Sequence, residues 1–224
     1  MYRRVFTRAG ELAIRNWWVL ATTFAYVLIM TATTFISPIL GIAGGFLLSL
    51  VYASCVGSFL YLVEMMVRTS RVTLEDFRRS FGAYLWDVVG VFFVMWIFQM
   101  IATPALGTMP QGYAILQCIR LAAFVLFNAL PEIIYLGHYS SLQLFVESYS
   151  FIGTNWIEWF PANIAAAIVV YSVGTLPLAA PLSYVQLAVV SLLIYFTMVM
   201  RGLLFLELYG SSRRGRAFKY RSGG

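Results

Sequence analysis

Residues 141–160 read SLQLFVESYSFIGTNWIEWF, a stretch that is too polar to cross a bilayer although long apolar runs flank it. Its first nine residues share the pattern (S/T)-L-x-x-F-x-x-S-(F/Y) with residues 73–81, TLEDFRRSF, at an offset of 68. The matched apolar positions recur at i, i+3 and i+7, which is the spacing of one helical face. Both stretches predict amphipathic helices, 73–86 and 141–156, that lie flat on the cytoplasmic membrane surface with aromatic side chains among the headgroups.

Aromatic residues on these stretches and after them mark the predicted start of the next span, as interfacial anchors do. A fainter copy of the pattern precedes the first span, where Phe6, Ala9 and Ala13 fall at the same offset. We expect the anchoring role for Trp17, Trp18, Phe77, Phe81, Trp86, Phe145, Tyr149, Trp156 and Trp159.

The chain therefore divides into three units, each an interfacial helix followed by a helical hairpin, at residues 3–70, 71–138 and 139–209, with a basic tail at 210–224. Because each unit contains two spans, all three run in the same direction, which predicts parallel repeats about an axis along the membrane normal. The alternative is that Leu and Phe at helical spacing are common to any interfacial helix, with no repetition behind them.

Composition places the chain in the membrane. Of its 224 residues, 61% are hydrophobic and only 11% are charged, and its mean hydropathy is +0.83. A soluble domain carries about 25% charged residues. Six apolar windows are long enough to cross a bilayer, near 17–36, 40–66, 88–107, 115–136, 160–179 and 184–208. The fold class is an all-α polytopic protein with six transmembrane helices in a single membrane domain.

Charge asymmetry predicts the orientation. The turns SPILG at 37–41, GTMPQG at 107–112 and PLAAPLS at 177–183 carry no charge, whereas the arginines cluster in the segments on the opposite side. By the positive-inside rule, both termini are cytoplasmic, and we expect the bacterial cytoplasmic membrane. The net charge of +6 lies beside apolar spans, so it favours anionic phospholipid over nucleic acid as the partner.

Charged residues near the inner ends of the spans are the best site candidates, because burying a charge in lipid is costly unless it is paired. Glu64 and Arg68 stand at i, i+4 and can pair, and Glu132, after the kinking Pro131, is a plausible partner for Arg201. The predicted polar cluster consists of Glu64, Arg68, Glu132, His138, Arg201 and Glu207. The alternative is that these side chains only snorkel to the interface.

The second span carries a ladder of small residues at every fourth position, which permits close approach of two helix backbones. Its members are Gly41, Gly45, Ser49, Ala53 and Gly57. The ladder is either a subunit interface or, as we favour, a packing surface for another span of the same chain.

Catalytic motifs are missing from the sequence. It contains no H-E-x-x-H, no G-x-S-x-G and no phosphate-binding glycine loop. Cys55, Cys118 and the lone His138 lack metal-ligand spacing, so we expect neither a metal nor a cofactor. Arg120 is the one basic residue in the outer half, where we expect it to snorkel to headgroups.

The tripled unit, with its two (S/T)LxxFxxS(F/Y) copies and its NW and W span starts, resembles a bacterial superfamily. This is the six-helix membrane domain that is fused to some glycerophosphoryl diester phosphodiesterases and also found in related stand-alone proteins. The resemblance covers most of residues 3–209 and implies six spans with both ends inside. It carries over no catalytic residue, because we expect spans and amphipathic helices to occupy the whole chain, without a phosphodiesterase domain.

Two function classes follow. The first is a non-enzymatic accessory or scaffold subunit that binds partner membrane proteins, or a second copy, together with inner-leaflet lipid. In that hypothesis the helices 73–86 and 141–156 bind the leaflet, and the region of Glu132 and Arg201 holds a headgroup or a partner's polar residue. The second is a transporter or lipid-handling protein, such as a permease subunit that needs a separate ATPase. An unrecognised lipid enzyme is a third, weaker alternative.

Overall fold

The computed structural model describes residues 1–137, 139, 142–177, 179 and 182–209. All the regular structure in these ranges is helical. In chain order the elements are α1 Tyr2–Arg15, α2 Trp18–Ile36, η1 Ser37–Leu40, α3 Ile42–Thr69, α4 Leu74–Ser80, α5 Leu85–Gly107, α6 Gly112–Leu126, α7 Leu130–Glu132, η2 Ile133–Gly137, α8 Gln143–Gly174 and α9 Leu182–Leu208.

Five of these helices, α2, α3, α5, α8 and α9, are long and apolar enough to cross a membrane. A sixth candidate is the pair formed by α6 and the α7–η2 segment, which is bent by 41° at a short break. The protein is therefore an integral, multi-pass membrane protein, and each candidate span overlaps one of the six apolar windows.

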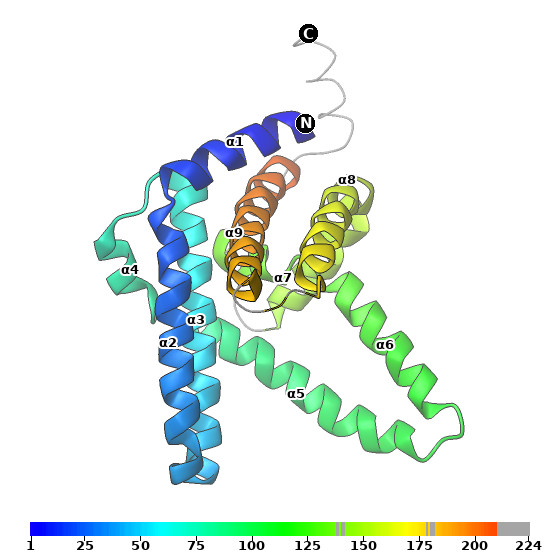
Figure 1. Ribbon diagram of the computed structural model, residues 1–224. Helices are drawn as coiled ribbons and strands as arrows, with labels where there is room; N and C mark the ends of the chain where they lie inside the picture. Colours follow the sequence, from blue (N-terminus) through cyan, green and yellow to red (C-terminus); the bar gives the residue numbers. More distant parts are fainter. Residues whose placement is uncertain (138, 140–141, 178, 180–181, 210–224) are drawn as a thin grey trace.

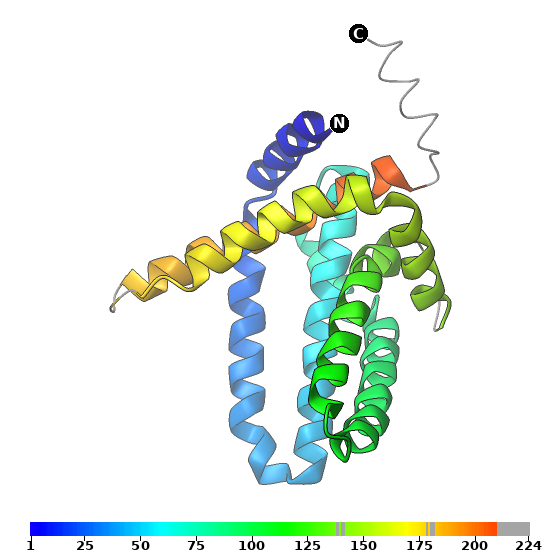
Figure 2. The same cartoon turned by 90° about the vertical axis from the view of Figure 1, so that its right-hand side faces the viewer.

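The repeat interpretation predicted that the three hairpins run parallel, but the structure does not show this. The tips of the α2–α3 and α5–α6 hairpins lie at the same end of the molecule, whereas the α8–α9 hairpin runs across them (Figures 1 and 2). The expectation of three hairpins in one direction is thus wrong for this arrangement, and the third hairpin is the one that departs.

The direction of the third hairpin follows from the continuity of α8. Residues 143–174 form one helix, roughly 48 Å long at 1.5 Å per residue, with Pro161 inside it. The first half buries residues at helical spacing, among them Leu144, Ser148 and Phe151, so that half is fixed in the core. Residues 141–156 are therefore not a separate interfacial helix, because the same helix continues without a turn into the predicted fifth span.

The first amphipathic stretch forms only the short helix α4, and its aromatic face contacts protein. Thr73 and Asp76 form a capping box at its start. The Phe77 and Phe81 rings each lie 6.1 Å from the Tyr26 ring of α2. These two phenylalanines thus pack on the first hairpin rather than projecting into headgroups as expected.

Helix α1 is amphipathic, and it rests on α9 across the end of the molecule that is opposite the α2–α3 and α5–α6 tips (Figure 1). Its buried residues are Val5, Ala9, Leu12 and Ala13, at the spacing of one helical face. They join a core built from the C-terminal parts of α3 and α9, the η2 segment and the first half of α8.

The ladder on α3 is used for packing along half its length. A Cβ atom on Gly57 would lie 3.1 Å from the backbone carbon of Tyr84, so the missing side chain lets the start of α5 approach α3. Ala53 is also fully buried. Gly41 and Gly45, at the N-terminal end of the ladder, face open space, so the described chain leaves that end uncovered.

Candidate functional site: a buried arginine–glutamate network

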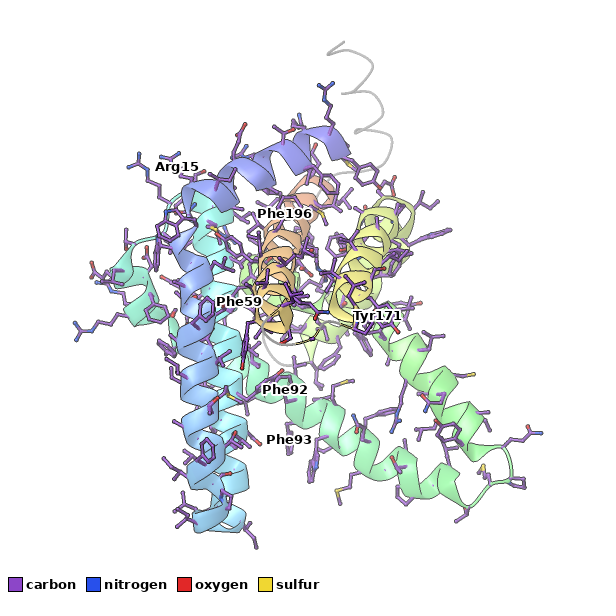
Figure 3. The ribbon with its side chains drawn as sticks, in the orientation of Figure 1. Arg15, Phe59, Phe92, Phe93, Tyr171 and Phe196 are labelled. Carbon is purple, nitrogen blue, oxygen red and sulfur yellow. The ribbon has the colours of Figure 1, made fainter. Side chains whose placement is uncertain are left out.

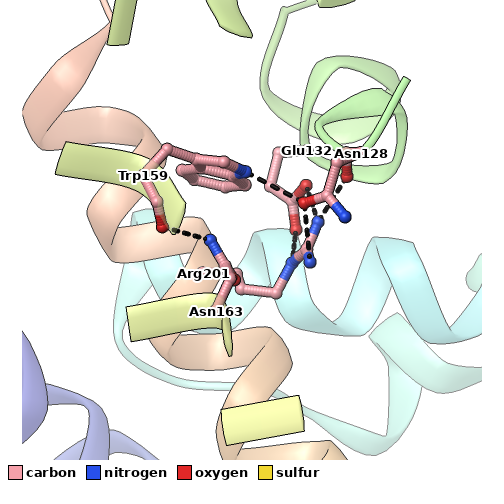
Figure 4. Close-up of polar contacts among 5 residues, drawn as sticks. All are labelled: Asn128, Glu132, Trp159, Asn163 and Arg201. Carbon is pink, nitrogen blue, oxygen red and sulfur yellow. Dashed lines mark hydrogen bonds and ion pairs between the residues drawn. The ribbon is translucent and has the colours of Figure 1, made fainter. Parts of the chain in front are cut away.

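Arg201 of α9 reaches the break in the bent pair α6 and α7–η2, where it meets the carboxylate of Glu132 (Figure 4). Its Nε atom donates to Glu132 Oε1 at 2.7 Å, and its Nη2 atom donates to Glu132 Oε2 at 2.8 Å. This is the bidentate geometry that makes an arginine–carboxylate pair strong and directional. The pairing expected from the sequence is present.

Asn128 completes the arginine's coordination from the turn just before α7. Its backbone carbonyl accepts from Arg201 Nη2 at 2.6 Å, and its side-chain oxygen accepts from Arg201 Nη1 at 3.3 Å. The same side-chain oxygen accepts from the indole Nε1 of Trp159 at 2.9 Å. Arg201 Cζ lies 5.1 Å from the centre of the Trp159 ring, within cation–π range. The network therefore joins α8, α9 and the break before α7.

The network is closed to the outside. The Glu132 side chain is 0% exposed and the Arg201 side chain only 13% exposed. A headgroup or a partner's side chain would find no exposed carboxylate atom here. The Arg201–Glu132 pair instead joins α9 to α7, and we call this pair the pin.

The second pair, Glu64 and Arg68, lies on α3 with Arg68 Nε 2.9 Å from Glu64 Oε1. Arg68 Nη2 also donates to the carbonyl of Leu136 in η2 at 3.1 Å, which connects the first hairpin to the bent segment. The hydroxyl of Tyr84 donates to Glu64. Burial first, and then the Glu64 carboxylate, raise the pKa of Tyr84, so this phenol stays protonated.

Tyr135 of η2 is fully buried within electrostatic reach of Glu132, Arg201 and Glu64. Its hydroxyl makes no hydrogen bond to any described residue. A Cβ atom on Gly202 would lie 2.8 Å from that hydroxyl oxygen, so the phenol occupies space that only glycine leaves open. Tyr135 therefore packs between the two ion pairs without a hydrogen bond that connects them.

The remaining members of the predicted cluster are placed separately. Glu207 at the end of α9 pairs with Arg4 of α1 and so helps to hold α1 against α9. His138 lies outside the described residues. The predicted single cluster is thus three ion pairs, at the junctions of α3 with η2, of α9 with α7, and of α9 with α1.

The predicted anchors fall into three groups. Trp17, Trp86, Tyr149 and Trp156 are exposed, and Trp18, Phe77, Phe81 and Phe145 are partly buried. Trp159 is fully buried against Phe151 and Arg201, so its assignment as an interfacial anchor is wrong. An indole with an arginine above its face and an amide oxygen at its N–H belongs to the core network.

Asn16 is a buried hub that sequence reasoning did not identify as a site. Its Oδ1 accepts from the backbone N–H of Val72 at 3.0 Å, and its Nδ2 donates to the carbonyl of Leu12 at 2.9 Å. Its own carbonyl accepts from the hydroxyl of Tyr195 on α9 at 3.0 Å. One residue thus fixes the α1–α2 junction to the loop after α3 and to α9. The NW dipeptides at 16–17 and 155–156 were the available signal.

A second missed signal is the offset between the two buried glutamates. Glu64 and Glu132 are separated by the same 68 residues as the two amphipathic stretches. Glu64 lies five residues before the end of α3, Glu132 ends α7, and each pairs with an arginine.

No family model, no curated protein and no solved structure matches the chain. Among the described residues, no group of three or more His, Cys, Asp or Glu side chains could hold a metal ion.

Proposed function

We propose that the chain is a non-enzymatic accessory or scaffold subunit that binds partner membrane proteins and inner-leaflet lipid. The proposal rests on how little of the second hairpin, α5 and α6, is covered by the rest of the described chain. Of the 23 residues of α5 only Val88 is buried, and α6 buries only Gly112 and Leu116, whereas α3 buries eleven of its 28 residues. Lipid can cover apolar side chains on such a hairpin, but it gives no hydrogen-bond partner to the polar side chains there.

The closed ion pairs support the same proposal. Ionisable side chains that mark a transport route commonly face a water-filled cavity. Glu132 instead accepts two hydrogen bonds from Arg201 and has no exposed surface. Charges paired in this way hold helices of the same chain together. The exposed surface of the second hairpin is then the part that can bind partners.

Lipid binding is proposed for the outward face of α1. Because α9 takes the apolar face of this helix, its arginines are exposed, although Arg4 also pairs with Glu207 of α9. Arg15 lies at its C-terminal end (Figure 3). A groove of about 850 Å³ runs beside Arg3, Arg4, Arg8 and Arg15. Clustered arginines at the membrane surface attract anionic lipid, at about 1 kcal/mol per charge. This face replaces the region of Glu132 and Arg201 as the proposed lipid contact.

We further propose the threefold repetition, the cytoplasmic termini, the bacterial cytoplasmic membrane and the kinship with the six-helix superfamily. The matched residues Ser80 and Ser148 support the repeats, since both are fully buried. Their partners, Ser58 and Leu126, are also 68 residues apart. Ser80 lies against Ser58 on α3, and Ser148 donates to the carbonyl of Leu126 on α6, so each reaches the preceding hairpin.

The test is native mass spectrometry of the chain, extracted from its own membrane in the mildest detergent that releases it. A partner membrane protein at fixed stoichiometry is the expected result. An ATPase at fixed stoichiometry would support the permease alternative instead. A chain that appears alone, with or without a defined phospholipid, would contradict the accessory-subunit proposal.

A further inference from the structure

One face of α6 combines polar and aromatic side chains that the described chain leaves uncovered. Tyr113, Gln117, Arg120 and Phe124 stand at i, i+4, i+7 and i+11, so they form one stripe along the helix. All four are exposed, and Tyr113 and Phe124 are 76% and 69% exposed. We call these four residues the α6 stripe.

Arg120 has neither a hydrogen bond nor an ion pair to any described residue. The sequence shows why: no Asp or Glu stands between Val88 and Pro131, so the whole α5–α6 hairpin apart from its first turn lacks an acid. Arg120 lies eight residues into α6, roughly 12 Å from the hairpin tip, in a hydrocarbon core about 30 Å thick. A cation at that depth requires a counter-charge, water or a headgroup.

We propose that the α6 stripe is the docking surface for a transmembrane helix of a different protein, and that this helix carries an Asp or Glu that pairs with Arg120. The inference rests on the proposed function and names the chemistry of the partner. Arginine and tyrosine are enriched among the residues that dominate interfaces. Gln117, beside Arg120, supplies both a donor and an acceptor to a facing helix.

A second copy of the chain has few acids to offer Arg120. Acidic residues are also absent from 12–63 and from 159–206, which include most of the other candidate spans. Among the acids that lie within the candidate spans and the bent pair, Glu64, Glu132 and Glu207 already pair with arginines of the same chain, and Glu147 and Glu158 lie on α8. Lipid phosphate is the other source of negative charge, since Arg120 points back along α6 towards the tip. Phosphate offers only acceptors, however, so it would leave the amide oxygen of Gln117 without a donor.

The experiment places a photo-crosslinking amino acid at Tyr113 of the full chain in its own membrane. The expected product is an adduct with a membrane-spanning peptide that contains Asp or Glu. Its yield should fall about tenfold in Arg120→Leu, the ratio that corresponds to about 1.4 kcal/mol of binding free energy. Arg120→Lys should retain part of the yield. Arg78→Leu, which removes an exposed arginine of α4, is the matched control and should retain all of it.

Substitution of the partner's acid identified in this way should lower the yield as Arg120→Leu does. The inference is overturned by adducts with lipid alone, by an adduct with a second copy, by no adduct, or by a yield that Arg120→Leu leaves unchanged. Native mass spectrometry of the wild-type chain separates the two proposals. A stable complex without a crosslink at Tyr113 would reject the α6 stripe and retain the accessory-subunit function, whereas a chain without any partner would reject both.

Discussion

The pin between Arg201 and Glu132 can be tested by removing either charge or both. Glu132→Gln keeps the size of the side chain but leaves the buried guanidinium without its counter-ion. Arg201→Met likewise leaves the buried carboxylate without its counter-ion. The double variant Glu132→Leu with Arg201→Met removes both charges from an environment that excludes water. Loss of one partner of a buried pair is far more costly than replacement of the whole pair by apolar side chains.

The geometry sets the magnitude. Each single variant disrupts the two hydrogen bonds between the charged side chains, at 2.7 and 2.8 Å, and strands a charge, and Arg201→Met also removes the two hydrogen bonds to Asn128. Each should therefore lower the free energy of unfolding by about 3–5 kcal/mol. For a chain of this size that corresponds to a fall in Tm of about 6–20 °C. The double variant should lie within about 1.5 kcal/mol of the wild type. Thermal unfolding of the purified chain in one mild detergent, followed by tryptophan fluorescence, measures all three.

Arg120→Met is the matched control, because it removes an arginine that has no partner among the described residues. In the purified chain it should change the free energy of unfolding by no more than about 0.5 kcal/mol. The reasoning is refuted if the two single variants unfold at the same temperature as the control. It is also refuted if the double variant loses as much as the two singles together, since additive losses mean that the two side chains are not coupled.

Three further predictions concern buried positions, two of them with an exposed position as the control. Gly57→Leu should lower Tm because its side chain would meet backbone at the start of α5, whereas Gly45→Leu, in open space, should leave Tm unchanged; thermal unfolding in detergent compares them. Trp159→Phe removes an indole hydrogen bond and should cost about 1–3 kcal/mol, while Trp156→Phe, on the exposed side of the same helix, should be nearly neutral in chemical unfolding. Asn16→Leu leaves a buried backbone N–H unpaired and should cost about 1–3 kcal/mol, with faster hydrogen exchange at residues 70–73 as its local signature.

Apolar length and charge were sufficient to predict the helical membrane class, because both are properties of single segments. Each of the six windows overlaps a candidate span, and the pairing of Glu132 with Arg201 could be anticipated from their similar depth. The direction of the third hairpin could not be predicted. Periodicity reports which face of a helix is apolar, but protein and headgroups cover such a face equally well. Residues 141–156 and Phe77 have the pattern of an interfacial helix, but Phe77 packs on Tyr26, and α8 buries a different face, with Leu144, Ser148 and Phe151, while Leu142 and Tyr149 stay exposed.

Trp159 shows the same ambiguity at the level of one residue. An aromatic side chain near the start of a span is typical of the interface, and that expectation follows from average composition. What fixed this indole in the core is the amide oxygen of Asn128 and the guanidinium of Arg201, from segments 31 and 42 residues away. A sequence without related sequences beside it contains no signal for such long-range partners.

The two buried glutamates explain why the third hairpin departs from the other two. Glu64 has its arginine four residues further along the same helix, so this pair can form wherever α3 lies. Glu132, at the equivalent position, has no arginine on its own helix and takes Arg201 from α9. That choice fixes the inner end of α9, and with it α8, against the break before α7. Met200→Arg with Arg201→Ala moves the cation by one residue, about 100° around α9, and should abolish the pairing with Glu132. If the pin is what holds the third hairpin across the others, crosslinks between α8 and η2 should then be lost while those between α3 and α5 persist.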